Sequence, residues 1–180
     1  MLIYLLFPVF NLLVGNIMIE IEVFPHRFLK ADTTEKFLND IYSIETVERV
    51  IVHGQPLPKT VYYGPARGTP VNHPERKEVL VNGVPVELTV MAGRFWILLE
   101  NDNELNKIEE ICKSLFPYGY NLNVGKFTRD SPTTTDYMKY GEKLVNSMDR
   151  KMIGLTDPRS KFASSVKMIP KNENAECEQN

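Results

Sequence analysis

The chain has 180 residues, a mass of 20.7 kDa, 43% hydrophobic residues and a net charge of -2. This length supports one domain with a single core and extensions, and the charge excludes a general polyanion binder, because such proteins carry a strong excess of Lys and Arg. Two cysteines, Cys112 and Cys177, show neither CxxC spacing nor a disulfide framework. The composition therefore predicts a cytoplasmic protein.

Residues 1–17 are strongly apolar, yet they match no targeting pattern. A signal peptide needs a positive n-region and an Ala-x-Ala cleavage site, and a membrane span needs to be longer and free of breaks such as Pro8 and Asn11. Because Met18 opens a well-patterned strand, we interpret residues 1–17 as an extension translated from a misplaced start. If it is made, this extension is a hydrophobic arm that seeks a partner or a membrane surface, and no other membrane contact is expected.

From Met18 onward the patterns predict alternating strands and helices. Ile and Val alternate with Glu over residues 19–24, which predicts a strand. Asp32 is an expected N-cap for a helix that extends to about Ile44. A β-branched run within residues 47–53 then predicts a strand that is covered on both faces.

A β-hairpin is predicted next, with strands over residues 78–81 and 84–91. The dipeptide Asn82-Gly83 between them suits the positive φ angles of a type I′ turn. Ala92-Gly93 is expected to break the pattern before another buried strand over residues 94–100.

The remaining elements are a helix over residues 102–116, a weaker edge strand over 121–127 and a third helix over 134–148 that either packs in the core or docks onto a partner. The whole order predicts an α+β domain over residues 18–155: a ferredoxin-like split βαβ sandwich with an extra hairpin strand, a long Pro/Gly loop and a C-terminal helix. Residues 156–180 are polar and predict a mobile tail.

The long loop is the most distinctive segment of the chain. Between Glu48 and Glu75, 26 residues contain no carboxylate, and five of the 12 prolines and three of the 10 glycines occur there. A loop this long is usually functional or disordered, and its stiffening by proline favours a shaped recognition surface displayed from a strand end. The alternative is an irregular connection without a function.

The usual signatures of catalysis are missing from the loop. His26, His53 and His73 form no metal-binding spacing, and no GxGxxG or GxxxxGK[ST] motif occurs. Cys112 is expected on the buried face of its helix, where burial raises the thiol pKa. In and beside the long loop, cationic residues combine with Tyr62 and Tyr63, which is the composition of an interface. The cations are Arg49, Lys59, Arg67, Arg76 and Lys77.

Four segments resemble the methyl-coenzyme M reductase operon protein D family. They are MIEIEVFPHRFL (18–29), VIVHGQPLP (50–58), YGPARGTPVNHPER (63–76) and GRFWI (93–97), and the resemblance covers about residues 18–157. It implies a small cytoplasmic protein of methanogenic archaea that is not a catalytic subunit. It also implies binding to methyl-coenzyme M reductase, in the form that lacks the nickel tetrapyrrole coenzyme F430, and assistance in its assembly or activation.

Our hypothesis from the sequence is that the loop and the nearby strand ends dock on the reductase and favour cofactor admission. No tightly bound cofactor and no metal are expected, only a transient contact with coenzyme F430. The predicted partner-binding residues are His53, Gln55, Pro58, Lys59, Tyr63, Gly64, Pro65, Arg67, Gly68, His73, Arg76 and Arg94.

Three alternatives remain at this stage. A carrier of F430 would use the same basic and aromatic residues to hold the tetrapyrrole itself. A nucleic-acid module shares the predicted fold, but the RNA-recognition signature is missing and the net charge is wrong. An enzyme would need His53 or His73 as a general base.

Overall fold

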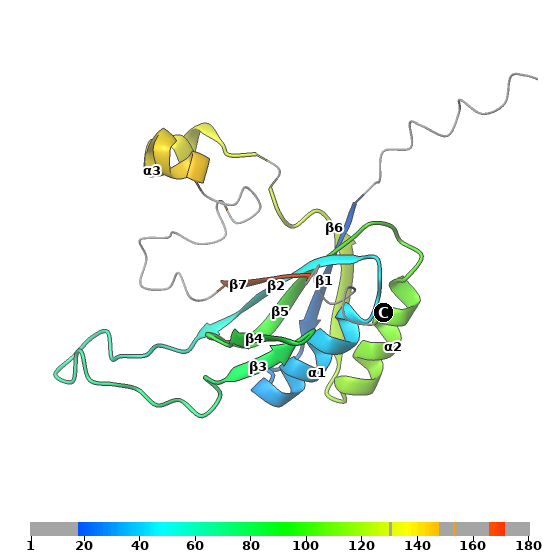
Figure 1. The fold of residues 1–180 in the computed structure, drawn as a ribbon, viewed down its shortest axis with the longest axis horizontal. Helices are drawn as coiled ribbons and strands as arrows, with labels where there is room; N and C mark the ends of the chain where they lie inside the picture. Colours follow the sequence, from blue (N-terminus) through cyan, green and yellow to red (C-terminus); the bar gives the residue numbers. More distant parts are fainter. Residues whose placement is uncertain (1–17, 130, 148–152, 154–165, 172–180) are drawn as a thin grey trace, which may run out of the picture.

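A computed structural model describes residues 18–129, 131–147, 153 and 166–171 (Figure 1). The elements in these residues, in chain order, are β1 (Ile19–Pro25), α1 (Ala31–Tyr42), β2 (Val47–Pro56), β3 (Glu78–Val81), β4 (Val84–Glu87), β5 (Val90–Leu99), α2 (Leu105–Leu115), β6 (Tyr120–Gly125), α3 (Thr134–Ser147) and β7 (Val166–Pro170). The predicted α+β class is confirmed. The apolar extension predicted for residues 1–17 lies outside the described residues.

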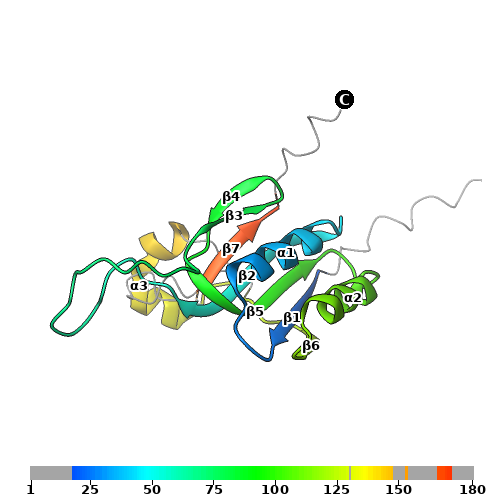
Figure 2. The ribbon, with the colours of Figure 1, turned by 90° about the horizontal axis from the view of Figure 1, so that it is seen from below.

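Five strands form one antiparallel sheet in the order β6-β1-β5-β2-β7, and β3 and β4 form a separate hairpin. Strands β1 and β2 both pair with β5, which lies between them. Helices α1 and α2 cover one face of this sheet, and α3 lies on the other side (Figures 1 and 2). Because β1 and β2 are both antiparallel to β5, they run in the same direction, and their C-terminal ends lie at the same end of the sheet.

The core fills the space between the sheet and helices α1 and α2. Alternate side chains of each strand point to this face, as the period of two requires, and Ile21, Val23 and Ile97 are fully buried. The Phe37 ring from α1 lies 4.5 Å from that of Phe95 on β5. Burial of each such side chain contributes roughly 1.5–3 kcal/mol, so the contact between the inner face of the sheet and the two helices stabilises the fold.

The boundary between β4 and β5 differs from the prediction. We expected one strand over residues 84–91 and a break at Ala92-Gly93, but β4 ends at Glu87 and β5 passes through both residues. Gly93 suits this strand because a Cβ there would lie 2.7 Å from the Phe28 ring. The glycine therefore allows a close aromatic contact and does not end the strand.

The expectation of a mobile tail was wrong for Val166–Pro170, which pair with β2 as β7. Val166 and Ile169 are buried in this strand. The Tyr42 hydroxyl donates a hydrogen bond to the Ile169 carbonyl and accepts one from the backbone N–H of Val50 at 2.9 Å. This strand extends the sheet beyond β2, and the other residues of the predicted tail, apart from Lys171, lie outside the described residues.

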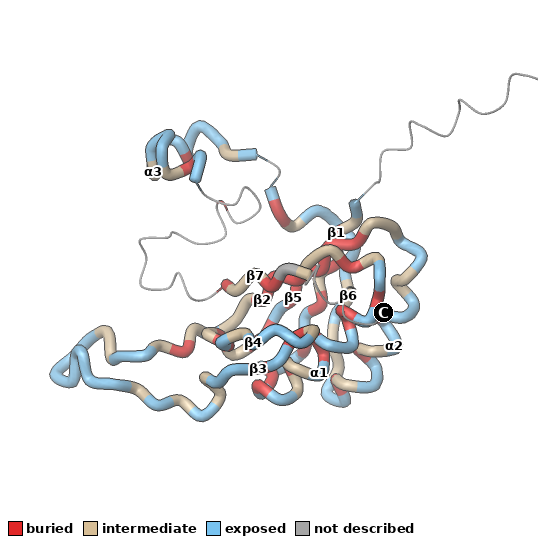
Figure 3. Tube along the Cα trace, viewed as in Figure 1, coloured by how far each residue is buried: buried red, intermediate tan, exposed pale blue. Residues whose placement is uncertain are grey.

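The third helix was expected at this position, but its environment favours the surface over the core. Within α3, Gly141 has a φ of 73° and interrupts the helical geometry. Met138 is 83% exposed and Tyr137 is 41% exposed, whereas Val145 is buried. Figure 3 shows the same contrast between the exposed α3 and the buried strands of the sheet.

We expect Gly54→Ala to lower the free energy of unfolding by at least about 2 kcal/mol, because it forces a clash within the backbone. The pairing of β2 with β5 shifts register between His53 and Gly54, and a Cβ at Gly54 would lie 1.9 Å from the Met91 carbonyl oxygen. Urea unfolding measures the change. Gln55→Ala, at the exposed next position, is the control and should stay within about 0.5 kcal/mol of wild type. Equal stability of the two variants would contradict this account.

Candidate partner-binding arm

Residues 57–77 form a projecting segment, here called the arm, that leaves the end of β2 and returns to β3 (Figures 1 and 3). Its two limbs bond to each other: the Val71 N–H donates to the Lys59 carbonyl at 2.8 Å, and the Val61 N–H donates to the Thr69 carbonyl at 2.9 Å. Leu57 is 2% exposed and anchors the arm in the protein. The sequence predicted a loop that leaves from a strand end, and the structure adds that the arm is a self-bonded surface hairpin.

The end of the arm, residues 63–68, is here called the tip. Gly64 and Gly68 have φ angles of 81° and 88°, which favour glycine at both positions. The Arg67 N–H donates to the Gly64 carbonyl at 3.1 Å and closes the turn. Tyr63 is 63% exposed, and the exposed Arg67 makes no ion pair with any residue that the structure describes. The tip thus presents a tyrosine and an arginine to solvent.

The base of the arm is held by Glu87, which lies outside the acid-free stretch. The Arg76 guanidinium contacts Glu87 Oε1 through Nε at 3.1 Å, and Lys59 Nζ contacts the same oxygen at 3.1 Å. Arg76 also donates to the Leu57 carbonyl. The hydrogen bond from Lys59, together with Arg76, holds the pKa of Glu87 below its usual value. Two of the predicted docking cations are therefore engaged within the protein.

The returning limb is attached to the beginning of α1. Glu75 Oε2 accepts a hydrogen bond from the Ala31 N–H at 2.6 Å, and Lys77 forms an ion pair with Asp32. A carboxylate is favourable at this position because the first N–H groups of a helix lack internal partners. His73 Nδ1 accepts from the Glu75 N–H at 3.2 Å. The arm is thus held by both the sheet and the helix layer.

His53 and Arg94 belong to the sheet and not to the arm. Glu22 on β1 accepts hydrogen bonds from Trp96 Nε1 at 3.2 Å and from Asn123 at 3.1 Å, and its Oε1 lies 3.2 Å from Arg94 Nε. The His53 ring packs on Trp96 with centroids 4.2 Å apart. Burial lowers the pKa of His53 to about 4, with a smaller contribution from Arg94. His53 is consequently neutral at pH 7 and a weak proton acceptor.

The structure separates the predicted residues into three environments. The tip contains Tyr63, Gly64, Pro65, Arg67 and Gly68; the rest of the arm contains Pro58, Lys59, His73 and Arg76; the strands contain His53, Gln55 and Arg94. Only the tip group is exposed throughout. Sequence reasoning missed Glu75 and Glu87, because their partners are distant along the chain and no local pattern marks them.

Cys112 is buried on its helix, as expected from the sequence. Burial raises the pKa of its thiol to about 12, with a further contribution from Glu109. Within the described part of the chain, no group of three or more His, Cys, Asp or Glu side chains could hold a metal ion. No helix in that part combines the length and the apolar character needed to span a membrane.

The fold and the arm define a small α+β protein that displays a braced, exposed hairpin, and binding and catalytic residues are disproportionately found on such surface loops. The family model described as methyl-coenzyme M reductase operon protein D matches residues 20–165. The chain belongs to this family, so the resemblance found in the sequence is confirmed.

Similar proteins carry the same name. The methyl-coenzyme M reductase I operon protein D of Methanocaldococcus jannaschii is 66% identical over 162 residues, which cover 88% of this chain and 99% of that protein. The operon protein D of Methanococcus voltae is 66% identical over 159 residues, with 88% and 100% covered. The methyl-coenzyme M reductase I operon protein D of Methanothermobacter marburgensis is 37% identical over 154 residues, which cover 86% of this chain and 98% of that protein. These names designate an operon protein and not a catalytic subunit.

We expect His53→Phe to reduce the loss of stability on acidification. The unfolded chain binds a proton at His53 near pH 6.5, whereas the folded protein does so only near pH 4, so this histidine contributes a loss of stability as the pH falls from 6.5 to 4. Phe keeps the ring on Trp96 and removes the proton site. Thermal unfolding at pH 7 and pH 5 should show a smaller fall in Tm for the variant than for wild type. An equal fall in both proteins would contradict the lowered pKa.

We expect Arg76→Ala to loosen the arm while the sheet stays intact, because the Arg76 side chain joins Leu57 to Glu87. Hydrogen exchange of the Val61 and Val71 amides should become faster by about tenfold or more, since loss of a charged hydrogen bond costs roughly 1.5–3 kcal/mol. Amides of β1 should keep their protection. Arg67→Ala, at the tip, is the control and should leave exchange at the base unchanged. Uniform acceleration in both regions would instead indicate global destabilisation.

Proposed function

We propose that this protein binds methyl-coenzyme M reductase, in the form lacking coenzyme F430, and acts as an accessory protein of methanogenesis in the cytoplasm. In this proposal it assists assembly, cofactor insertion or activation of the reductase and carries out no catalysis itself. The family and the names of its similar proteins support the choice of partner. Any contact with F430 is transient.

The single observation that carries the proposal is the exposed tip on a braced arm. Binding normally costs conformational entropy when loops become ordered. The hydrogen bonds between the two limbs already order the arm before binding, so less entropy is lost when a partner binds. Tyr and Arg are enriched among the residues that dominate interface energies. The tip therefore offers a preorganised contact of the right composition.

The proposed mechanism depends on a difference between the affinities of this protein for the open and the closed state of the reductase. A binding protein shifts its partner towards an open state only if it binds that state more tightly than the closed one. A narrow projecting arm suits this role, because it can occupy a gap that exists only in the open partner. In this proposal the arm holds the reductase open until the cofactor enters, and closure then releases the arm.

We also assign the strand order β6-β1-β5-β2 to the ferredoxin-like arrangement, with the β3-β4 hairpin and β7 as additions. The support is the order strand-helix-strand, strand-helix-strand in β1-α1-β2 and β5-α2-β6, with both units in one antiparallel sheet. The arm is then an insertion between the second and third strands of that arrangement.

Carriage of F430 itself is the alternative function. A pocket of about 240 Å³ lies beside the helices, whereas pockets for drug-sized ligands occupy roughly 300–1,000 Å³. This volume favours a contact with one group of a ligand over enclosure of a whole tetrapyrrole. Reductase binding is consequently the better-supported proposal.

We expect the double variant Tyr63→Ala, Arg67→Ala to retain at most about a tenth of wild-type capture of the F430-free reductase, because truncation of interface Tyr and Arg residues costs upward of about 2 kcal/mol. Affinity pull-down from cell extract with quantitative mass spectrometry measures the capture. Lys36→Ala, an exposed position on α1, is the matched control. Undiminished capture by the double variant, with both proteins folded, would refute the role of the tip.

A further inference from the structure

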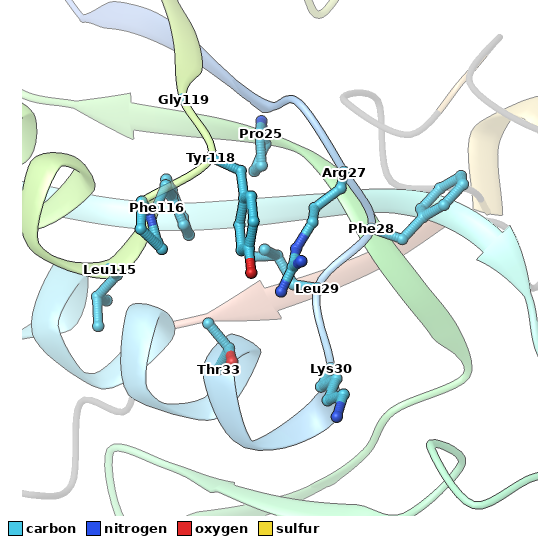
Figure 4. Close-up of a pocket in the computed structure, with 11 residues that line it drawn as sticks. Pro25, Arg27, Phe28, Leu29, Lys30, Thr33, Leu115, Phe116, Tyr118 and Gly119 are labelled. Carbon is cyan, nitrogen blue, oxygen red and sulfur yellow. The ribbon is translucent and has the colours of Figure 1, made fainter.

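A pocket of about 240 Å³ lies at the same end of the sheet as the arm, between the segment after β1 and the end of α2. The arm does not line it. Figure 4 shows Arg27 and Tyr118 side by side above the first turn of α1, with Thr33 below them. Leu29 and Phe116 are buried and supply an apolar wall. The pocket thus combines an apolar interior with polar groups at its mouth.

Arg27 is the chemically distinctive side chain of this pocket. Its guanidinium carbon lies 3.5 Å from the centre of the Tyr118 ring, and the stacking fixes the plane of the charged group. Among the residues that the structure describes, Arg27 has no ion pair and no hydrogen-bonded carboxylate. Its N–H groups are therefore available to a ligand.

The side chains that line the pocket carry only positive charge. Lys30 is exposed and lines the pocket together with Arg27, which adds a second positive charge. Asp32 at the beginning of α1 pairs with Lys77, and Glu75 of the arm accepts a hydrogen bond from the Ala31 N–H; neither acid lines the pocket. An anion in the pocket would consequently contact two cations and no lining carboxylate.

The exposed Tyr118 at the mouth favours contact with a large partner. Tyr118 is 62% exposed, whereas the Phe28 ring, 52% exposed, points away from Arg27 and lies against Gly93 (Figure 4). Tyr and Arg are enriched among the residues that dominate interface energies. The volume accommodates one or two side chains and not a whole cofactor. An acidic side chain of a protein, next to an apolar residue, matches the charge, the size and the exposed rim.

We propose that this pocket binds an Asp or Glu carboxylate of a partner protein, held by the Arg27 guanidinium, with a neighbouring apolar side chain against Leu29 and Phe116. The partner is the one that the arm contacts, so the inference rests on the proposed function for the identity of that partner. The arm and the pocket then form two separate contacts at one end of the protein.

The first test uses acetyl-Glu-Phe-amide as the probe and acetyl-Gln-Phe-amide as its uncharged match. Amide shifts in NMR titration of the full chain should cluster at residues 25–33 and 115–119 with the acidic probe. The Gln probe, or the exposed substitution Arg27→Gln, should weaken binding by about tenfold or more, as expected for a charge-assisted hydrogen bond. Equal binding of both probes, or shifts confined to the arm, would overturn the proposal.

The second test is capture of the F430-free reductase by wild type and by Arg27→Gln, with Lys36→Ala as control. Reduced capture by Arg27→Gln alone supports the pocket as a contact. Acidic-probe binding at the pocket without capture by wild type would refute the proposed function and the identity of the partner, while the carboxylate site would stand. Capture that is insensitive to Arg27→Gln, together with no probe binding, would overturn the pocket and leave the proposed function intact.

Discussion

The pairing of β2 with β5 is the constraint on which the rest of the structure depends. It extends from Val47 opposite Leu99 to Pro56 opposite Val90 and continues into the hydrogen bond from the Leu57 N–H to the Thr89 carbonyl at 2.8 Å. Residues 57–89 are thus one insertion between two central strands. Because the entropy of loop closure rises only slowly with length, a ladder anchored in the core can carry an insertion of this length, and Val79, Val81 and Leu88 within the insertion add their own burial to that core.

The cations of the arm have different roles although they lie close together in the sequence. Arg76 and Lys59 share Glu87 and hold the base, whereas Arg67 faces solvent at the tip. Exposed ion pairs are individually weak, but Arg76 also bonds to a backbone carbonyl, so its contribution depends on geometry and not only on charge. The density of positive charge along the sequence therefore overstates the charge that a partner meets.

Patterns that depend on neighbours in the sequence predicted most of the elements. Alternation predicted β1, and Asn82-Gly83 predicted the β3-β4 turn, in which both residues have positive φ angles of 49° and 76°. Strand β7 was missed because its five residues have no turn signal or periodic pattern, and its stability comes from β2. Of the predicted site, the tip was accessible to sequence reasoning as a Pro/Gly-rich turn. The roles of Glu87 and Arg27 follow from tertiary pairing, which no local signal reports.

The arm and the Arg27 pocket share one rigid support. Glu75 on the returning limb binds the first N–H of α1, and Thr33 in the first turn of the same helix lines the pocket. When two contacts are held at a fixed separation, the complex loses rotational freedom only when the first contact forms. The second contact then forms at a high effective concentration, provided that the two matching points on the partner have the same separation. Opposite charge alone accelerates the encounter of the two proteins, whereas two contacts at fixed positions also determine how the proteins are oriented in the complex. If both contacts form as proposed, a protein with a net charge of only -2 selects its anionic partner by the positions of these contacts and not by its overall charge.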